Sequence, residues 1–239
     1  MKRVGYRLVL FGALLFTTVA PGLVRAEAGL KDVVTALEQG YLLLDDLQAD
    51  FSQRTAIASI KKEQRGSGTL FIKKPSGAAA MFRFNYEKPR QQIVSNGKAV
   101  WFYMPENRQV LVSDAANLFD AQNGITLNYL TGLDHVSKDF TAGFAGTGRD
   151  KKGNFVLELI PKKQNRVIAK LQITVAASAV EQFIKDGRVE DPFPVISSVV
   201  YDPFGNRTAI EFSRAKTNRG ISGALFNFKI PSGVDVIKR

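Results

Sequence analysis

The side chains that most often carry chemistry are sparse in this chain of 239 residues. His135 is the only histidine, and the chain contains no cysteine. Cysteine nucleophiles, disulfides and thiolate metal sites are therefore excluded, and no histidine cluster is available to bind a metal. A serine hydrolase needs only one histidine, but no Gly-x-Ser-x-Gly sequence accompanies it. A lone histidine of this kind is more often structural or solvated than catalytic.

Acidic pairs and glycine-rich stretches offer no better site. Asp45-Asp46 and Glu190-Asp191 are adjacent in sequence, but adjacency alone places no reactive water between two carboxylates. Gly66-Ser67-Gly68 and the glycines of residues 143–148 lack the sequence of a P-loop or of a dinucleotide-binding turn. We therefore predict a protein that is not an enzyme and that holds no metal and no cofactor.

The first 26 residues have the pattern of a secretory signal peptide. A charged start precedes an apolar run from Leu8 to Ala20, and Val24 and Ala26 occupy the small-residue positions of a cleavage site. The run is short for a membrane span, which needs about 20 residues. We expect cleavage after Ala26, which leaves residues 27–239 as a single domain.

The predicted mature chain is basic and lacks a cysteine for lipid attachment. Loss of the four positive charges of the leader (Lys2, Arg3, Arg7 and Arg25) lowers the net charge from +11 to +7. A basic secreted protein suits anionic membrane surfaces or acidic partners. The positive residues are dispersed and form no nucleic-acid-binding motif, so no nucleic acid partner is expected. The periplasm is the expected location, and a monomer is the simplest state.

A helix followed by strands begins the mature chain. Apolar residues recur at helical spacing from Leu30 to Leu37, Asp32 lies near the helix start, and Gly40 is expected just past its end. Asn96-Gly97 is a hairpin signal because both residues tolerate positive φ. Strands are predicted over residues 47–56, 64–73, 80–87, 91–95, 99–104 and 109–112.

The most informative strand pattern is Phe-Arg-Phe-Asn-Tyr at residues 82–86. Strand geometry places Phe82, Phe84 and Tyr86 on one face, and the intervening polar residues on the other. Such a one-sided aromatic surface is either ordinary core beneath a seated helix or a place that holds lipid.

The second half of the chain continues the sheet. Between residues 114 and 133 the apolar period changes and Asn123-Gly124 interrupts it, which predicts two short helices that cover the sheet. Residues 176–194 either extend a strand or form an extra helical turn. The predicted fold is a mainly β, strongly curved antiparallel sheet with helices over one face. The remaining strands are predicted over residues 137–142, 154–160, 169–175, 195–201, 207–213 and 223–230.

Several consecutive segments carry a family resemblance. They are Gly68–Pro75, Phe82–Pro89, Ile93–Tyr103, Gln109-Val110 and Phe226–Val234. Each match alone is weak, but their order and spacing across residues 28–239 resemble the LolA family. Members of that family are periplasmic carriers of outer-membrane lipoproteins.

This resemblance implies an unclosed β-barrel of about eleven antiparallel strands, with short helices as a lid over its apolar concave face. It also implies a partner set. Carriers of this kind accept triacylated lipoproteins from an inner-membrane ABC transporter and deliver them to an outer-membrane receptor. The receptor resembles the carrier but is itself a lipoprotein, so the absence of cysteine favours the carrier.

The resemblance marks four positions as candidates for lipid or lipoprotein binding. Phe82 matches a position linked to transfer and to contact with the transporter. Phe84 matches a position that points into the cavity, and Tyr86 shares its face. Trp101 is a further candidate, although the sequence does not say whether Trp101 or Phe102 lines the cavity.

The candidate for lid closure departs from the family pattern. Lys74 precedes Pro75, where the family usually has an arginine that closes the lid through hydrogen bonds. Lysine keeps the charge but loses the planar fork of the guanidinium group, so we expect the closed lid to be held differently here.

Two other functions stay open on these residues. The same fold could serve as a lipid-sensing or regulatory module, but regulatory relatives usually carry a second domain for which we expect no room here. A hydrolase built on His135 has no partner residue in view. The carrier is therefore the favoured interpretation.

Overall fold

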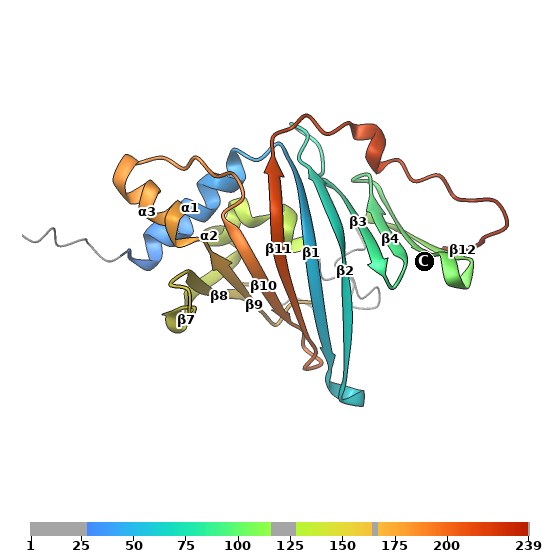
Figure 1. Cartoon of the computed structure of the whole chain (residues 1–239), viewed down its shortest axis with the longest axis horizontal. Helices are drawn as coiled ribbons and strands as arrows, with labels where there is room; N and C mark the ends of the chain where they lie inside the picture. Colours follow the sequence, from blue (N-terminus) through green and yellow to red (C-terminus); the bar gives the residue numbers. More distant parts are fainter. Residues whose placement is uncertain (1–27, 116–127, 164–166, 239) are drawn as a thin grey trace, which may run out of the picture.

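A twelve-stranded β-sheet forms the body of the protein (Figure 1). The computed structural model describes residues 28–115, 128–163 and 167–238. The strands are β1 (Asp46–Ile57), β2 (Lys62–Lys73), β3 (Met81–Lys88), β4 (Gln91–Ser95), β5 (Ala99–Met104), β6 (Gln109–Asp114), β7 (Phe140–Arg149), β8 (Phe155–Pro161), β9 (Lys170–Val175), β10 (Val195–Tyr201), β11 (Arg207–Thr217) and β12 (Asp235–Lys238).

The helical segments are short. The α-helices are α1 (Leu30–Leu42), α2 (Val136–Asp139) and α3 (Ala177–Asp186). Single turns of 3-10 helix are η1 (Ala58–Ile60), η2 (Pro105–Asn107), η5 (Asn128–Thr131), η6 (Leu133–His135) and η7 (Gly223–Phe226).

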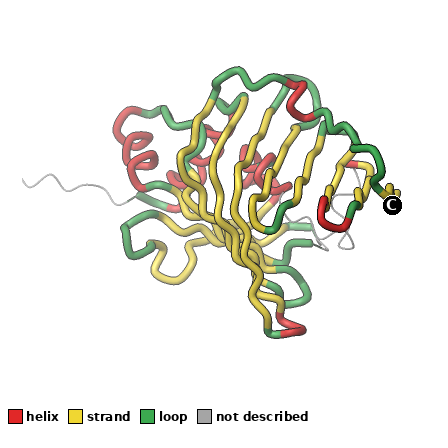
Figure 2. The backbone as a smooth tube through the Cα atoms, turned by 45° about the vertical axis from the view of Figure 1, so that its right-hand side comes forward, coloured by secondary structure: helices red, strands yellow, loops and turns green. Residues whose placement is uncertain are grey.

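The sheet is curved but not closed. Its strand order is β12-β6-β5-β4-β3-β2-β1-β11-β10-β9-β8-β7, so β12 and β7 form two separate edges. Figure 2 shows helical segments on the inner side of the curved sheet. The predicted mainly β fold, an unclosed sheet with helices over one face, is confirmed. A short twelfth strand, which pairs in parallel with β6, is an addition to the expected antiparallel set.

Helix α1 packs against the concave face of the sheet as its apolar spacing predicts. Val33, Val34 and Leu37 are buried in the main core. At the N-terminus, Asp32 Oδ2 accepts a hydrogen bond from the Gly29 N–H at 2.9 Å, which satisfies one of the free amides of the first turn.

The predicted helix end at Gly40 is wrong. The helix continues to Leu42, and Gly40 lies inside its last turn. A Cβ atom at this position would lie 2.9 Å from the Asp191 carbonyl oxygen and 3.1 Å from Pro194 Cδ. Gly40 therefore allows a neighbouring segment to approach the helix closely, and it does not terminate the helix.

Two strand predictions in the second half need correction, and one open alternative is decided. Residues 136–139 form helix α2, so the strand expected from residue 137 begins at Phe140. Residues 223–230 contain the turn η7 and no strand, because Phe226 and Phe228 pack onto the sheet without joining its ladder. Residues 177–186 form the ten-residue helix α3, which decides between the two alternatives for that segment. The helices expected between residues 114 and 133 fall largely on residues 116–127, outside the described part.

The strand register defines which side chains share a face. Phe84 of β3 pairs with Ile93 of β4, and Ile93 pairs with Phe102 of β5, so these three face the concave side. Arg83 and Trp101 flank Val94 on the convex side in the same way. The main core fills the concave side and includes Phe84 and Ile93.

Candidate functional site

The aromatic strip on the concave face consists of Phe51 from β1 and Phe82, Phe84 and Tyr86 from β3. All four are buried, and Phe84 is only 1% exposed. The Phe51 ring centroid lies 5.4 Å from that of Phe84 and 4.8 Å from that of Tyr86, with edge-to-face geometry in both pairs. The prediction that Phe82, Phe84 and Tyr86 share one face is confirmed. Phe51 was missed, although the period-two pattern of β1 places it on the same face as Leu47.

The glycine-rich stretch at residues 66–68 makes room for this strip. Gly66 lies under the Tyr86 ring, where a Cβ atom would come within 3.0 Å of Tyr86 Cε1. A Cβ atom on Gly68 would lie 1.9 Å from the Asn85 carbonyl oxygen, at a bulge between β2 and β3. Both glycines therefore serve close packing of the strands.

Tyr86 marks the boundary between the apolar strip and a polar mouth. Its hydroxyl donates a hydrogen bond to Gln53 Oε1 at 2.7 Å. A pocket of about 500 Å³ opens here, and its lining residues include Gln53, Arg65, Tyr86 and Gln91. The concave face therefore changes from hydrocarbon-like to polar along β3.

A lid segment, defined here as residues 128–139 (η5, η6 and α2), covers the apolar part of the concave face. Tyr129, Leu130, Leu133 and Val136 are buried in the same core as the aromatic strip. Of the helical cover predicted over residues 114–133, the described residues contain η5 and the start of η6, whereas α2 lies where a strand was predicted.

Polar tethers join the lid segment to three different elements. The Tyr129 hydroxyl is hydrogen-bonded to the Ser198 hydroxyl of β10. Glu38 Oε1 of α1 accepts hydrogen bonds from Ser137 N at 2.6 Å and from Ser137 Oγ at 2.7 Å. The third tether is Lys74, just beyond the end of β2.

Lys74 makes two hydrogen bonds at the edge of the lid segment. Its Nζ donates to Asp134 Oδ2 of η6 at 2.7 Å and to the Tyr41 carbonyl oxygen of α1 at 2.8 Å. The side chains of Lys74 and Asp134 are 17% and 13% exposed, so water screens this ion pair only in part. Lys74 therefore joins the end of β2 to η6 and α1, and its role in closing the lid stays a prediction. Asp134 could not be found from sequence, because nothing local links it to Lys74.

Three tyrosines on or near the lid segment are buried. Burial raises the pKa of Tyr41, of Tyr86 and of Tyr129 above the ordinary value, because the charged phenolate loses its hydration. For Tyr129 the hydrogen bond with Ser198 partly opposes this rise. All three therefore remain neutral hydrogen-bonding groups at neutral pH.

Trp101 does not lie with the aromatic strip. It faces the convex side of β5, and its ring contacts that of Phe228 with centroids 6.1 Å apart. Phe102 points to the concave side and packs against the main core. The geometry thus does not support Trp101 as a neighbour of the aromatic strip, and Phe102 takes the place for which Trp101 was a candidate.

The convex cover is the chain segment from residue 218 to residue 234, which follows β11 and leads to β12. Figure 1 shows this segment passing over the ends of the central strands. Phe226 of this segment is fully buried, as are Val94 of β4 and Val110 of β6. None of these three belongs to the main core of the concave side.

The convex cover is fastened by one buried and one partly buried polar side chain. The Asp46 carboxylate, 1% exposed, accepts hydrogen bonds from the backbone N–H groups of Arg219, Gly220 and Ile221 at 2.8, 2.9 and 3.0 Å. Arg83 Nη1 donates to the Leu225 carbonyl oxygen at 3.0 Å, and burial lowers the pKa of this guanidinium group. Of the pair Asp45-Asp46, Asp46 is therefore structural.

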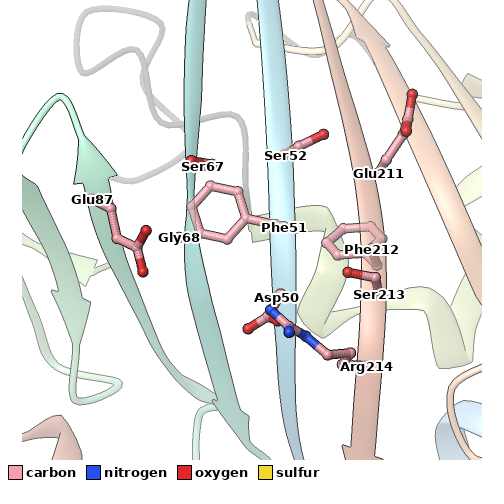
Figure 3. A pocket seen from close by; sticks show the side chains of 10 residues that line it. All are labelled: Asp50, Phe51, Ser52, Ser67, Gly68, Glu87, Glu211, Phe212, Ser213 and Arg214. Atoms are coloured by element: carbon pink, nitrogen blue, oxygen red, sulfur yellow. The ribbon is translucent and has the colours of Figure 1, made fainter.

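A second pocket lies across β1, β2, β3 and β11 (Figure 3). Its volume is about 360 Å³, and the lining is mainly polar, with an ion pair between Asp50 and Arg214. Figure 3 shows these two side chains directed toward each other. Such a lining suits water or polar groups better than acyl chains.

The remaining candidates for chemistry form no site. His135 is exposed at the end of η6. Asp191 Oδ1 accepts a hydrogen bond from Phe193 N, within its own turn. Among the described residues, no group of three or more His, Cys, Asp or Glu side chains could hold a metal ion. In the same part of the chain, no helix has the length and apolar character needed to cross a membrane.

Comparisons with known proteins identify the family of the chain. Residues 43–192 match the family described as outer membrane lipoprotein carrier protein LolA. An outer-membrane lipoprotein carrier protein of Azotobacter vinelandii is 30% identical over 96% of this chain and 99% of its own length. The carrier protein of Methylococcus capsulatus is 30% identical over 80% of this chain and 81% of its own.

Among solved structures, a LolA superfamily protein of Nitrosomonas europaea has a TM-score of 0.41 and 13% identity, covering 84% of this chain and 99% of that one. A likeness at this level adds nothing to the assignment, which rests on the sequence matches. Since the family match extends over more than half of the chain, the protein belongs to the LolA family of outer-membrane lipoprotein carrier proteins.

Proposed function

We propose that this protein carries acylated lipoproteins across the periplasm. It would accept them from an inner-membrane ABC transporter and deliver them to an outer-membrane receptor. The curated relatives are named for outer-membrane lipoprotein transport, which supports the class of cargo. The action is binding and release, without a chemical step on the cargo.

Transport of such a cargo is a problem of hydration. Each methylene exposed to water costs about 0.8 kcal/mol, so one acyl chain of about 16 carbons costs roughly 12 kcal/mol. Three chains cannot cross an aqueous compartment unshielded. A carrier must cover them with an apolar surface and yet release them, which favours a cover that can open.

The observation that carries the proposal is the aromatic strip beneath the lid segment. Phe51, Phe82, Phe84 and Tyr86 form a continuous apolar surface on a sheet that is not closed. The lid segment over it combines apolar packing with the three polar tethers. Lys74 is the lid-closing residue in this proposal, because its ion pair with Asp134 joins the sheet to the lid segment.

The rest of the proposal concerns processing and assembly. Residues 1–26 would act as a cleaved leader, and residues 27–239 would fold as one domain and work as a monomer in the periplasm. No nucleic acid, metal or cofactor has a part in this function.

Release of lipoproteins from spheroplasts tests the proposal. The purified protein is added to spheroplasts that contain the cognate transporter, and the supernatant is assayed for a complex with lipoprotein. A one-to-one complex is the expected result. No release by the folded protein would contradict the carrier function.

A matched pair of aromatic substitutions localises the binding surface. Phe82→Ala changes the concave face, and Trp101→Ala changes the convex face of the same sheet. We expect Phe82→Ala to reduce the yield of complex roughly tenfold, since it removes apolar contact with the acyl chains. Trp101→Ala should leave the yield within about twofold of the parent protein. Equal losses in both variants would contradict a binding surface on the concave face.

A further inference from the structure

The hydroxyl group of Tyr41 is a buried donor without a partner. Tyr41 is 0% exposed, and its buried Oη makes no hydrogen bond within the part of the chain that the structure describes. Buried polar groups in native proteins are almost always hydrogen-bonded, and leaving one unmade destabilises the folded state. An unpaired hydroxyl at this depth therefore needs a physical reason.

The position of Tyr41 links it to the lid segment. Its backbone oxygen accepts one of the two hydrogen bonds of Lys74, and Lys74 Nζ lies 5.8 Å from the centroid of its ring. The hydroxyl feels the charge of Asp134 and the neighbouring hydroxyl of Tyr129, both of which belong to the lid segment. Tyr41 thus lies beneath the contact that must break when the lid segment moves.

The chemistry of the cargo contains a matching group. The carbonyl oxygen that joins an acyl chain to its glyceryl or amino group accepts hydrogen bonds, and an ester carries no donor of its own. Within an apolar cavity such a carbonyl would lose its hydrogen bonds to water. A neutral phenol supplies one donor at little cost, because burial keeps Tyr41 protonated at neutral pH.

We propose that the Tyr41 hydroxyl donates a hydrogen bond to an ester carbonyl at the head of a bound acyl chain. This inference rests on the proposed carrier function and adds a polar subsite to its apolar cavity. In the free protein this hydroxyl has no acceptor among the described residues beneath the closed lid segment. In the loaded protein it fixes the depth at which the acyl chains enter.

Two probes test the subsite directly. The first is a synthetic triacylated lipopeptide with ester-linked chains, and the second is its dialkyl ether analogue, which lacks the two ester carbonyls. We expect the parent protein to bind the ester probe roughly fivefold more tightly than the ether probe. In Tyr41→Phe this preference should disappear through loss of affinity for the ester probe alone.

Tyr201→Phe is the matched control for binding. Tyr201 lies on β10, and its hydroxyl donates to Gln172 on the face opposite the main core. This variant should retain the preference for the ester probe. If Tyr41→Phe also retains it, or weakens both probes equally, the proposed hydrogen bond does not exist.

Stability of the free protein gives an independent test with the opposite sign. Tyr41→Phe removes an unpaired hydroxyl, so the free variant should unfold at the same or a higher temperature than the parent. Tyr129→Phe removes a paired hydroxyl and should lower the unfolding temperature. A marked loss of stability in Tyr41→Phe would mean that its hydroxyl is already engaged, and would overturn the proposal.

The outcomes also separate this inference from the carrier function. If the parent protein binds neither probe and releases no lipoprotein, the carrier function fails and the subsite fails with it. If the parent protein binds both probes equally, carrier function survives and only the Tyr41 subsite is rejected.

Discussion

The two faces of the sheet are both covered, but by different physical means. On the concave face, the lid segment packs apolar side chains over the aromatic strip and is held by the tethers at Lys74, Glu38 and Ser198. On the convex face, a shorter apolar layer lies beneath a segment whose backbone N–H groups bond to the buried Asp46 carboxylate.

The two covers differ in how readily their hydrogen bonds can be broken. A buried carboxylate that accepts three backbone hydrogen bonds cannot lose them without leaving several polar groups unpaired. In the lid segment the hydrogen bonds to Glu38 are exposed and the ion pair of Lys74 is partly exposed, so both can be exchanged for water, and only the bond between Tyr129 and Ser198 is buried. The convex cover is therefore expected to stay in place while the concave cover moves.

Removal of the Asp46 carboxylate should have the largest effect. Asp46→Ala leaves three backbone N–H groups without their acceptor, and we expect a loss of about 4 kcal/mol in the free energy of unfolding. Chemical denaturation followed by circular dichroism measures it. Asp45→Ala, at the exposed neighbouring residue, is the control and should change stability by less than about 0.5 kcal/mol. Similar values for both would show that the convex cover is not fastened here.

Truncation of one buried phenylalanine on each face sharpens the comparison. Phe84→Ala and Phe226→Ala each remove a fully packed ring and should each cost about 3 kcal/mol of stability. Only Phe84→Ala should also reduce lipoprotein uptake from spheroplasts. Reduced uptake in Phe226→Ala, with the protein folded, would mean that the convex layer takes part in binding.

Alkaline pH should destabilise the concave side through its buried tyrosines. The pKa values of Tyr41, Tyr86 and Tyr129 are raised in the folded state, so the unfolded chain loses these protons first. Their stabilising contribution is present below about pH 10 and falls by about 1.4 kcal/mol per tyrosine for each further pH unit. Denaturation at a series of alkaline pH values measures the slope. In Tyr86→Phe the loss of unfolding free energy per pH unit should be smaller by the contribution of one tyrosine, about 1.4 kcal/mol. An unchanged slope would contradict the burial of Tyr86.

The smallest effect on stability is expected at Lys74. Lys74→Met removes the ion pair with Asp134 and should cost about 1 kcal/mol, because the pair is partly exposed. The effect on local opening is measured by amide hydrogen exchange, which should accelerate roughly fivefold in residues 128–139. The neighbouring Lys73→Met serves as the control. Unchanged exchange in the Lys74 variant would remove Lys74 from the closing of the lid segment.

Much of this architecture is local and therefore predictable. The period-two pattern of residues 82–86 predicted one buried face correctly, and strands β4, β5 and β10 have the predicted bounds. Patterns of this kind report which side chains avoid water, and this information lies within a few neighbouring residues.

The predictions fail where contacts with residues far away in the sequence determine the structure. Trp101, Phe102 and Tyr103 are consecutive aromatics, so no alternation distinguishes their faces, and only pairing with β4 does. Phe226 and Phe228 have strand spacing, but their segment packs across the sheet instead of pairing in it. The acidic partner of Lys74 could not be predicted from the sequence either, because only the folded lid segment brings Asp134 near Lys74.

An open sheet carries a hazard that a closed barrel avoids, since a free edge can pair with another chain. Here one edge is β12, which has only four residues and ends near Lys238. The other is β7, whose pairing with β8 is interrupted between Phe144 and Arg149, where Gly146 and Gly148 have positive φ. A short strand and a bulged strand are poor templates for sheet extension. The sheet can thus stay open without pairing edge to edge with other copies.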